Sequence, residues 1–275
     1  MVQVTLGSDK VSIPESVAIG IIGGTGIYDQ ESFENLKEIK VYTPFGETSD
    51  VISVGLYKKI KVAFIPRHGR NHTIPPHKVN YRANIWALKQ LRIKRIIATT
   101  AVGSLRKDYG PGTFVIPDQF IDRTKKRIDT FYEGGQVCHI SAADPFCNQL
   151  RCFFITEAKE LGLDIKKNGT YVCIEGPRFS TRAESRLFQT WKADVVGMTL
   201  YPECILAREA EMSYVSISIV TDYDVWAENP VSTKEVIEKA KESNEKIKKL
   251  ILKVIPQIPK SRDCYCGSAL KDALM

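Results

Sequence analysis

Two carboxylates separated by one residue are the first candidates for chemistry: Asp222 and Asp224 follow the β-branched run Tyr214–Val220. If both enter one low-dielectric pocket, like-charge repulsion and desolvation raise the pKa of one of them. That carboxyl can then give a proton to a leaving group near neutral pH. Two other interpretations stay open, a metal site and a turn that Asp222 caps. No partner carboxylates or histidines with ligand spacing are evident, which counts against the metal.

A glycine turn is the second candidate. Gly23, Gly24, Thr25 and Gly26 follow the apolar run Val17–Ile22. Glycines let backbone N–H groups converge on an anion, and the Thr25 hydroxyl adds a donor. A dinucleotide-binding loop needs a third glycine, and a Walker A loop needs Gly-Lys-Ser/Thr. The spacing in this turn matches neither. The turn alone leaves phosphate binding and a plain tight turn both open.

Two further groups of polar residues follow apolar runs. Arg67 and His68 come after Lys61–Pro66, and the segment Thr99–Ser104 ends another run. The planar guanidinium of arginine suits phosphate, and histidine adds a donor. Hydroxyls and turn amides in the second group can complete a phosphate cradle. A surface pair and a simple strand exit are the competing interpretations.

Alternating strands and helices must position these groups, and the sequence predicts an α/β sandwich around a mostly parallel or mixed sheet in one domain. The candidate residues fall just past strand ends, where open α/β sheets bind ligands. This joint placement favours one anion-and-base pocket over four unrelated turns. The expected strands are Val17–Ile22, Lys61–Pro66, Arg95–Thr100, Tyr171–Ile174 and Tyr214–Val220. Helices are expected along Tyr81–Leu91 and Leu150–Leu161, after a capping box at Thr181–Glu184, and from a second capping box at Ser232–Glu235 to Pro256.

Composition narrows the class of protein. The chain of 275 residues is 43% hydrophobic and 26% charged, which is typical of a globular fold. No apolar run reaches the roughly 18 residues of a membrane span, and no secretory signal opens the chain, so we expect a cytoplasmic protein. The net charge of +7 is spread over short clusters, which indicates a solvated surface and no nucleic-acid partner.

Seven cysteines are many for such a chain. No C-x-x-C pair occurs, so we predict no metal site. Reduced thiols are the default inside cells, although the Lys/Glu-rich final helix fits a hyperthermophilic source, in which intracellular disulfides occur.

The sequence resembles the 5′-methylthioadenosine phosphorylases over residues 17–226, and more weakly through the last helix. The stretches that carry the resemblance are GIIGGTGIY, TPFGETSD, IPRHGRNHTIPPHKVNYRANIWALK, TTAVGSLRKDYGPGTFVIPDQFIDRT, CHISAADPFC, IEGPRFSTRAESRLFQTWKADVVGMTLYPE and SIVTDYDVW.

The resemblance implies a purine nucleoside phosphorylase fold, a mixed central sheet flanked by helices in one domain. We assign residues 1–260 to this domain and residues 261–275 to a cysteine-containing tail. The implied reaction is phosphorolysis of 5′-methylthioadenosine to adenine and 5-methylthioribose 1-phosphate. Inorganic phosphate is then a co-substrate, and no cofactor is expected. A purine nucleoside phosphorylase of broad specificity, which also accepts adenosine, inosine or guanosine, is the alternative.

The resemblance also assigns roles by position. Asp222 and Asp224 are expected to face N7 and the 6-amino group of adenine, with Asp222 as proton donor. Ser180 and Thr233 match specificity positions. His139 matches a residue that reaches a neighbouring subunit's 5′ pocket, so we expect a trimer or a dimer of trimers. The phosphate residues are Thr25, Arg67, His68, Thr100, Ala101 and Thr199, and the other substrate residues are Met198, Phe179 and Tyr223.

The chain departs from the family pattern at three places. Gly197 stands where asparagine is expected, and Thr233 replaces an expected valine. Both changes favour a broader substrate range. The tail with its C-x-C motif has no recognised counterpart, and it leaves the 5′ edge of the site undecided. We predict bridges between Cys138 and Cys204 and between Cys264 and Cys266, the second in a small, strained ring.

Overall fold

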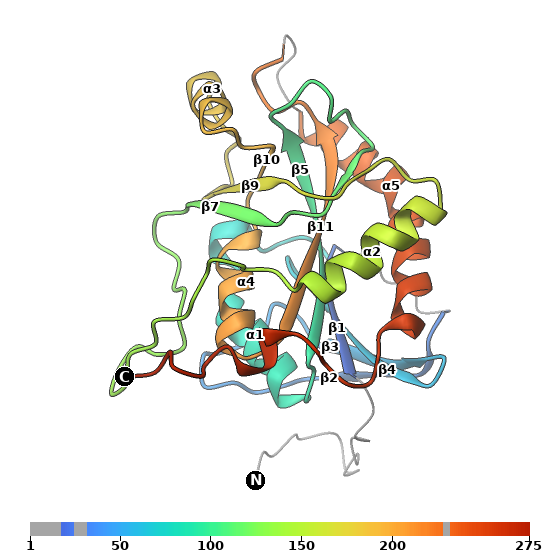
Figure 1. Cartoon of the computed structure of the whole chain (residues 1–275), viewed down its shortest axis with the longest axis vertical. Helices are drawn as coiled ribbons and strands as arrows, with labels where there is room; N and C mark the ends of the chain where they lie inside the picture. The colour runs from blue at the N-terminus through green and yellow to red at the C-terminus, as the bar shows by residue number, and fades with distance from the viewer. Residues whose placement is uncertain (1–17, 25–31, 228–231) are drawn as a thin grey trace.

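The chain is represented by a computed structural model, which describes residues 18–24, 32–227 and 232–275 (Figure 1). Thr25 and Gly26 of the glycine turn lie outside the described residues. Two layers of helices cover a central sheet, and the expected α/β sandwich with a mixed sheet is confirmed.

An eleven-stranded mixed sheet forms the centre of the described structure. Its main path runs β2-β3-β4-β1-β5-β10-β9-β7, and β11 pairs with β5 and β6. Parallel pairing of β1 with β4 and β5, and of β5 with β11, brings the carboxyl ends of four strands to one edge. The strands are β1 (Ala18–Gly23), β2 (Glu34–Ile39), β3 (Ile52–Tyr57), β4 (Ile60–Pro66), β5 (Arg95–Ser104), β6 (Phe114–Val115), β7 (Gln119–Arg123), β8 (Ile165–Lys166), β9 (Thr170–Ile174), β10 (Val195–Gly197) and β11 (Ser213–Asp222).

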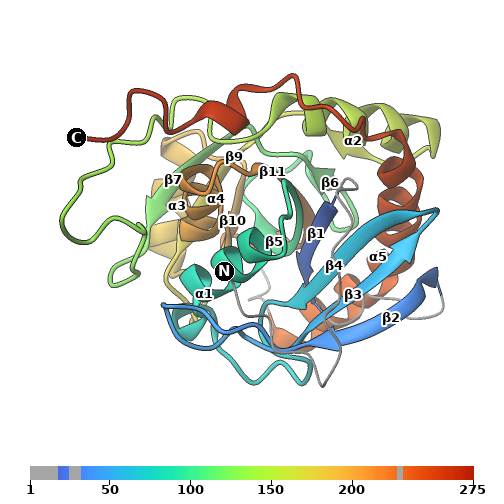
Figure 2. The same ribbon diagram turned by 90° about the horizontal axis from the view of Figure 1, so that it is seen from below.

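Helices pack on both faces of this sheet. Residues of α1 and α4 belong to one hydrophobic core, and residues of α2 and α5 belong to another on the opposite face (Figures 1 and 2). The helices are α1 (Tyr81–Gln90), α2 (Asn148–Glu160), α3 (Arg182–Thr190), α4 (Leu200–Glu209) and α5 (Thr233–Val254), with short 3₁₀ turns η3 (Pro76–Lys78), η4 (Ile255–Gln257) and η5 (Tyr265–Ser268).

Local signals explain several helix ends. The predicted capping box at α3 is confirmed, because Thr181 Oγ1 accepts from Glu184 N and the Glu184 carboxylate accepts from Thr181 N. Gly162, with φ of +65°, ends α2 in a conformation that favours glycine. The second capping box involves Glu235, whose side chain lies outside the described residues. No helix in the described part of the chain is long and apolar enough to cross a membrane.

After α5 the C-terminal segment passes the start of α2 and ends beside residues 137–139 (Figure 2). Arg262 donates to the carbonyl of Glu211 at 2.7 Å. At its end, His139 N donates to Ala273 O at 2.8 Å, and Met275 N donates to Val137 O at 3.0 Å. The tail is therefore tied to the segment that carries His139.

All seven cysteines are free thiols, so the two predicted disulfides are wrong. Cys204 is fully buried in α4, whereas Cys138 lies on the outer segment that pairs with Leu274. Cys264 and Cys266 flank Tyr265 at the start of η5, and their sulfurs lie within 4.8 Å of each other and of Cys147 Sγ as separate thiols.

Candidate active site

The predicted anion-binding residues gather where β1, β4 and β10 end, beside the middle of β5, whose strand continues to Ser104. Arg67 follows β4 directly, and its backbone N–H donates to Gly23 O at 3.1 Å. This bond joins the arginine to the glycine turn, whose Gly24 is exposed. Thr25 itself lies beyond the described residues, so its place in the site stays a prediction.

Arg67 is buried and held by Glu203 of α4. Its Nε and Nη2 donate to the two carboxylate oxygens at 2.6 and 2.8 Å, and Nη1 donates to Thr99 O at 2.9 Å. Burial acts to lower the pKa of Arg67, but the charge and hydrogen bonds of Glu203 raise it above its usual range. The Tyr214 hydroxyl also donates to Glu203, at 2.8 Å. Glu203 therefore balances the charge of the Arg67 guanidinium and holds it in a fixed orientation beside Thr99 of β5.

The surroundings of His68 favour its neutral form. Burial lowers its pKa to about 4, and the charge of Arg67 adds to the effect. Its Nδ1–H donates to Ile74 O at 2.8 Å, so Nε2 keeps a lone pair. In the neutral form the remaining ring nitrogen of His68 is an acceptor, and it becomes a donor only on protonation.

Hydroxyl groups meet across β5 and the start of α4. The Oγ1 atoms of Thr100 and Thr199 are 3.1 Å apart, and both residues are buried. Thr199 precedes α4 without capping it through its side chain, which leaves that hydroxyl facing β5. Ala101 follows in β5, in register with Ile219 of β11. The predicted phosphate residues Arg67, Thr100, Ala101 and Thr199 are thus brought together.

Tyr171 fills the space beside Gly197 that an asparagine side chain would take. A Cβ on Gly197 would lie 1.9 Å from the Tyr171 hydroxyl. Burial raises the pKa of Tyr171, and the side chain of Thr100 and the backbone of Thr199 oppose that shift. Its oxygen is buried and has no well-aligned hydrogen-bond partner among the described residues. The glycine in place of the expected asparagine therefore leaves no cavity, because the phenol of Tyr171 occupies the position of the asparagine amide.

Asp222 and Asp224 share the end of β11. Asp222 accepts from Thr221 Oγ1 and from Asp224 N, both at 2.7 Å. Asp224 is buried, and burial raises its pKa, whereas the hydroxyls of Ser185 and Ser180 oppose that shift. Neither hydroxyl makes a well-aligned hydrogen bond to Asp224 Oδ2. Of the two carboxyls, Asp224 is thus the one that burial gives a raised pKa.

The carboxyl pair lies against Gly103 of the neighbouring strand. A Cβ on that glycine would be 2.9 Å from Asp222 Oδ1 and 3.1 Å from Asp224 Cβ. Asp224 has φ of +50°, a left-handed turn that aspartate tolerates better than most residues. Because Gly103 comes two residues after Ala101, the pair lies close to the end of the hydroxyl cradle.

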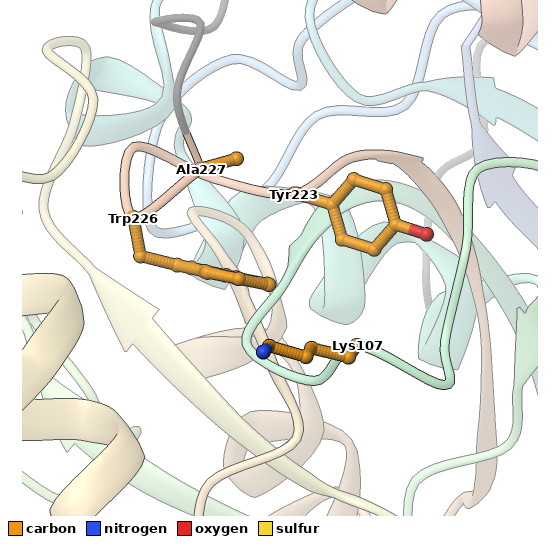
Figure 3. A pocket seen from close by; sticks show the side chains of 4 residues that line it. All are labelled: Lys107, Tyr223, Trp226 and Ala227. Atoms are coloured by element: carbon orange, nitrogen blue, oxygen red, sulfur yellow. The ribbon is translucent and has the colours of Figure 1, made fainter.

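An open cavity of about 380 Å³ is lined by Lys107 and by Tyr223, Trp226 and Ala227 of the segment around the end of β11 (Figure 3). The rings of Tyr223 and Trp226 meet edge to face at 5.6 Å. Ser180 is buried close to Asp224, and Phe179 beside it is half-buried. Met198 packs on the β9 exit, where its Sδ would lie 2.7 Å from a Cβ on Gly176.

Two predicted residues stand apart from this group. His139 lies on an exposed segment whose backbone pairs with the tail. Thr233 begins α5 and is exposed, next to residues outside the described ranges. Glu203, Tyr171 and Ser185 were not predicted from the sequence. For Glu203, an acidic residue inside the otherwise apolar segment Leu200–Ala207 is the one signal in the sequence.

Comparison with known proteins agrees with this architecture. A family model described as "Phosphorylase superfamily" matches residues 18–256. The chain therefore belongs to the phosphorylase superfamily.

Individual relatives and solved structures show which family within the superfamily this chain belongs to. The S-methyl-5′-thioadenosine phosphorylase of Hyperthermus butylicus is 58% identical over 261 residues, which cover 94% of this chain and 95% of that protein. The methylthioadenosine phosphorylase of Schistosoma mansoni, solved with adenine, is 37% identical with a TM-score of 0.88 and covers 94% and 99% of the two chains. A variant adenosine/methylthioadenosine phosphorylase of that organism, solved with methylthioadenosine, is 38% identical with a TM-score of 0.86 over the same shares. Within the superfamily, this chain belongs to the S-methyl-5′-thioadenosine phosphorylases.

Proposed function

We propose that this chain catalyses phosphorolysis of 5′-methylthioadenosine. A phosphate oxygen forms a bond to C1′ while the bond from C1′ to N9 breaks, and the adenine gains a proton as it leaves. The observation that carries the proposal is the meeting of the Arg67, Thr100 and Thr199 cradle with the Asp222 and Asp224 pair on adjacent strands. Free phosphate is the nucleophile, so the reaction needs no cofactor.

The phosphate is proposed to lie against Arg67, His68, Thr100, Ala101 and Thr199, with Thr25 on the glycine-turn side. Fixed donors place its negative charge against a sugar that becomes cationic as the base departs. In its neutral form His68 can accept through Nε2. The single hydroxyl of HPO₄²⁻ can donate a hydrogen bond to that nitrogen. The supporting feature is the buried, permanently charged Arg67.

The adenine is proposed to lie between the carboxyl pair and Phe179, with Tyr223 beside it and Met198 at the ribose. A carboxylate accepts from the 6-amino group, and a protonated carboxyl donates to N7. The different surroundings of the two carboxyls support this division, since burial raises the pKa of Asp224 and Asp222 accepts two hydrogen bonds. Ser180 and Thr233 stay proposed specificity positions.

Assembly into trimers or dimers of trimers is proposed to complete the 5′ pocket through His139. The segment around this residue exposes apolar side chains, with Val137 53%, Leu274 38% and Met275 83% exposed. An apolar patch beside an exposed histidine suits the surface of a second copy of the chain. Seven free thiols fit the proposed cytoplasmic location. The division at residue 260 also stays a proposal.

A phosphate-dependence assay tests the proposed reaction. Adenine should appear from 5′-methylthioadenosine when phosphate is present and stay near background in phosphate-free buffer. Adenine released at equal rates in both buffers would identify a hydrolase and contradict the proposal. Comparing kcat/KM for methylthioadenosine, adenosine and inosine then measures the breadth of substrates, and the methylthio nucleoside should rank first.

A further inference from the structure

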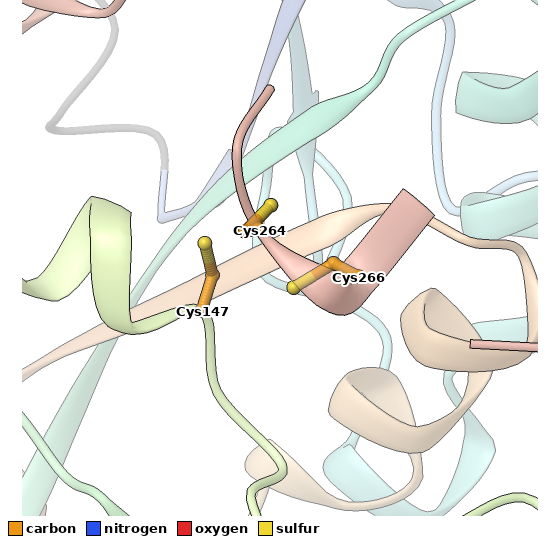
Figure 4. Close-up of side chains that lie close together, drawn as sticks. All are labelled: Cys147, Cys264 and Cys266. Atoms are coloured by element: carbon orange, nitrogen blue, oxygen red, sulfur yellow. The ribbon is translucent and has the colours of Figure 1, made fainter. Parts of the chain in front are cut away.

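Three cysteines from distant parts of the sequence meet at one point. The sulfurs of Cys147, Cys264 and Cys266 all lie within 4.8 Å of one another (Figure 4). Cys147 precedes α2, whereas the other two lie on the C-terminal segment. Cys147 and Cys266 are buried and Cys264 is half-buried. The cluster could not be predicted from the spacing of the cysteines, because Cys147 meets the C-x-C pair only in the folded protein.

The cluster is separate from the active site. Cys147 N donates to Tyr214 O at 2.8 Å, and Ser213 Oγ lies 3.1 Å from Cys264 Sγ. Ser213 begins β11, while Asp222 ends it. At strand geometry, these two ends are about 30 Å apart. The three thiols therefore take no part in the reaction proposed above.

The surroundings of the cluster favour thiolates. Cys147 lies at the N-terminus of the thirteen-residue helix α2, whose dipole stabilises negative charge.

A buried cation lies beside the sulfurs. Arg95 is 1% exposed, and one of its terminal nitrogens donates to Ser261 O at 2.7 Å. Burial lowers the pKa of Arg95, and the thiols of Cys264 and Cys147 oppose that shift. Its Nε is buried and has no hydrogen-bond partner among the described residues. A charged group in this position compensates an anionic cluster.

We propose that Cys147, Cys264 and Cys266 form a structural Zn²⁺ site. Zinc bonds thiolates at about 2.3 Å, which places tetrahedral sulfur ligands about 3.8 Å apart. The observed limit of 4.8 Å requires a contraction of about 1 Å or less between any two sulfurs. Ser213 Oγ or a water takes the fourth position. A divalent ion on three thiolates leaves one negative charge, which Arg95 neutralises.

The proposed site would fasten the tail to the core. Its ligands join the start of α2 to residues just beyond α5, and the tail then continues to the backbone of His139. Binding releases the thiol protons and contributes to folding, because the ligands are dispersed in the unfolded chain. Zinc should therefore stabilise the folded protein without altering the chemistry of the active site.

Competition with a chromophoric chelator tests the proposal on the full-length chain, reduced and stripped of metal. One Zn²⁺ per chain should be retained by the wild type and by Cys152→Ser, an exposed cysteine outside the cluster. Cys147→Ser and Cys266→Ser should each weaken retention by about 100-fold or more, comparable with the loss of a charged metal ligand. Co²⁺ should give sulfur-to-metal charge-transfer absorption in the first two proteins and lose it in the others.

Thermal unfolding provides a second readout that does not depend on activity. Zinc should raise Tm of the wild type and of Cys152→Ser, and it should leave Tm of Cys147→Ser unchanged. Circular dichroism checks that each variant is folded before titration. Equal zinc affinity in Cys147→Ser and the wild type would overturn the site. Retention of Cu⁺ but not of Zn²⁺ in the same format would overturn the choice of zinc.

Discussion

Asp224 is the carboxyl of the pair that burial favours in its protonated form, and Asp222 is the one that accepts two hydrogen bonds. The family resemblance assigns proton donation to Asp222. The structure adds Asp224 as a second candidate donor, because its raised pKa keeps a proton available at higher pH. Coupled carboxyls titrate as a pair, so separate variants are needed to assign the proton.

Replacing each carboxyl separately should identify the donor. Asp222→Asn and Asp224→Asn keep the shape of the side chain but cannot transfer a proton. The donor's variant should lose about 10²–10⁴-fold in kcat, and its rate should no longer fall as pH rises through the donor's pKa. The pH profile of kcat measures both effects. A variant with wild-type kcat and an unchanged alkaline limb would remove that residue as donor.

The same raised pKa affects stability. The folded protein binds the Asp224 proton more tightly than the unfolded chain, whose carboxyl has its ordinary pKa of 3.8. The contribution is therefore fully present below that value and is lost as pH rises through the folded pKa. Urea unfolding of Asp224→Asn should show a smaller loss of stability across this interval than the wild type. An identical pH dependence in the two proteins would contradict the raised pKa.

Tyr171 is expected to donate to the phosphate, because its buried hydroxyl lacks a well-aligned partner beside Thr100 and Thr199. Tyr171→Phe should raise KM for phosphate about 10-fold or more, as expected for a lost hydrogen bond to a charged group. KM for the nucleoside should change little, and Tyr57→Phe on β3 serves as control. An unchanged phosphate KM would show that the ring only fills the space beside Gly197.

At the scale of elements, the close approach of β5 to the end of β11 positions the carboxyl pair. Gly103→Ala would place a methyl group 2.9 Å from Asp222 Oδ1. We expect kcat to fall at least about 10-fold while the protein stays folded, because a displacement near 1 Å misaligns proton transfer. Gly134→Ala, where a Cβ would meet nothing within 4 Å, is the matched control. Equal kcat in both variants would show that the pair tolerates displacement.

The junction of β4 with α4 depends on the buried Arg67 and Glu203 pair. Glu203→Gln should lower the free energy of unfolding by about 3–5 kcal/mol, because it leaves a buried guanidinium without its counter-charge. Glu245→Gln, whose side chain is 80% exposed in α5, should change it by less than about 1 kcal/mol. Chemical denaturation measures both. A small effect at Glu203 would mean that water or a bound anion replaces the carboxylate.

At the scale of the whole molecule, a shared site predicts complementation between variants. His139→Ala and Asp222→Asn should each be weakly active alone. Mixed oligomers, formed by refolding the two together, should regain activity at sites with an intact Asp222 and a neighbour's intact His139. Steady-state assays combined with light scattering measure this recovery and the assembly. Activity equal to the average of the separate proteins would exclude a site completed across subunits.

Much of the scaffold followed from local patterns. The runs before Gly23, Arg67 and Asp222 are strands as expected, because continuous β-branched and apolar residues suit buried parallel strands. Thr181 and Glu184 marked the start of α3 for the same local reason. Six strands, β2, β3, β6, β7, β8 and β10, and the helix α4 were not predicted, since tertiary pairing holds their residues more than their own periodicity does.

The sequence by itself determined the α/β class and the strands that precede Arg67 and Asp222, because these follow from residue types and short-range order. It also predicted one site for Arg67, Thr100, Asp222 and Asp224. Tertiary structure decided what surrounds them. Burial assigned the raised pKa to Asp224, packing put Tyr171 in the space beside Gly197, and folding placed Cys147 against the C-x-C pair. Burial and long-range contact depend on the path of the whole chain, which no local spacing records.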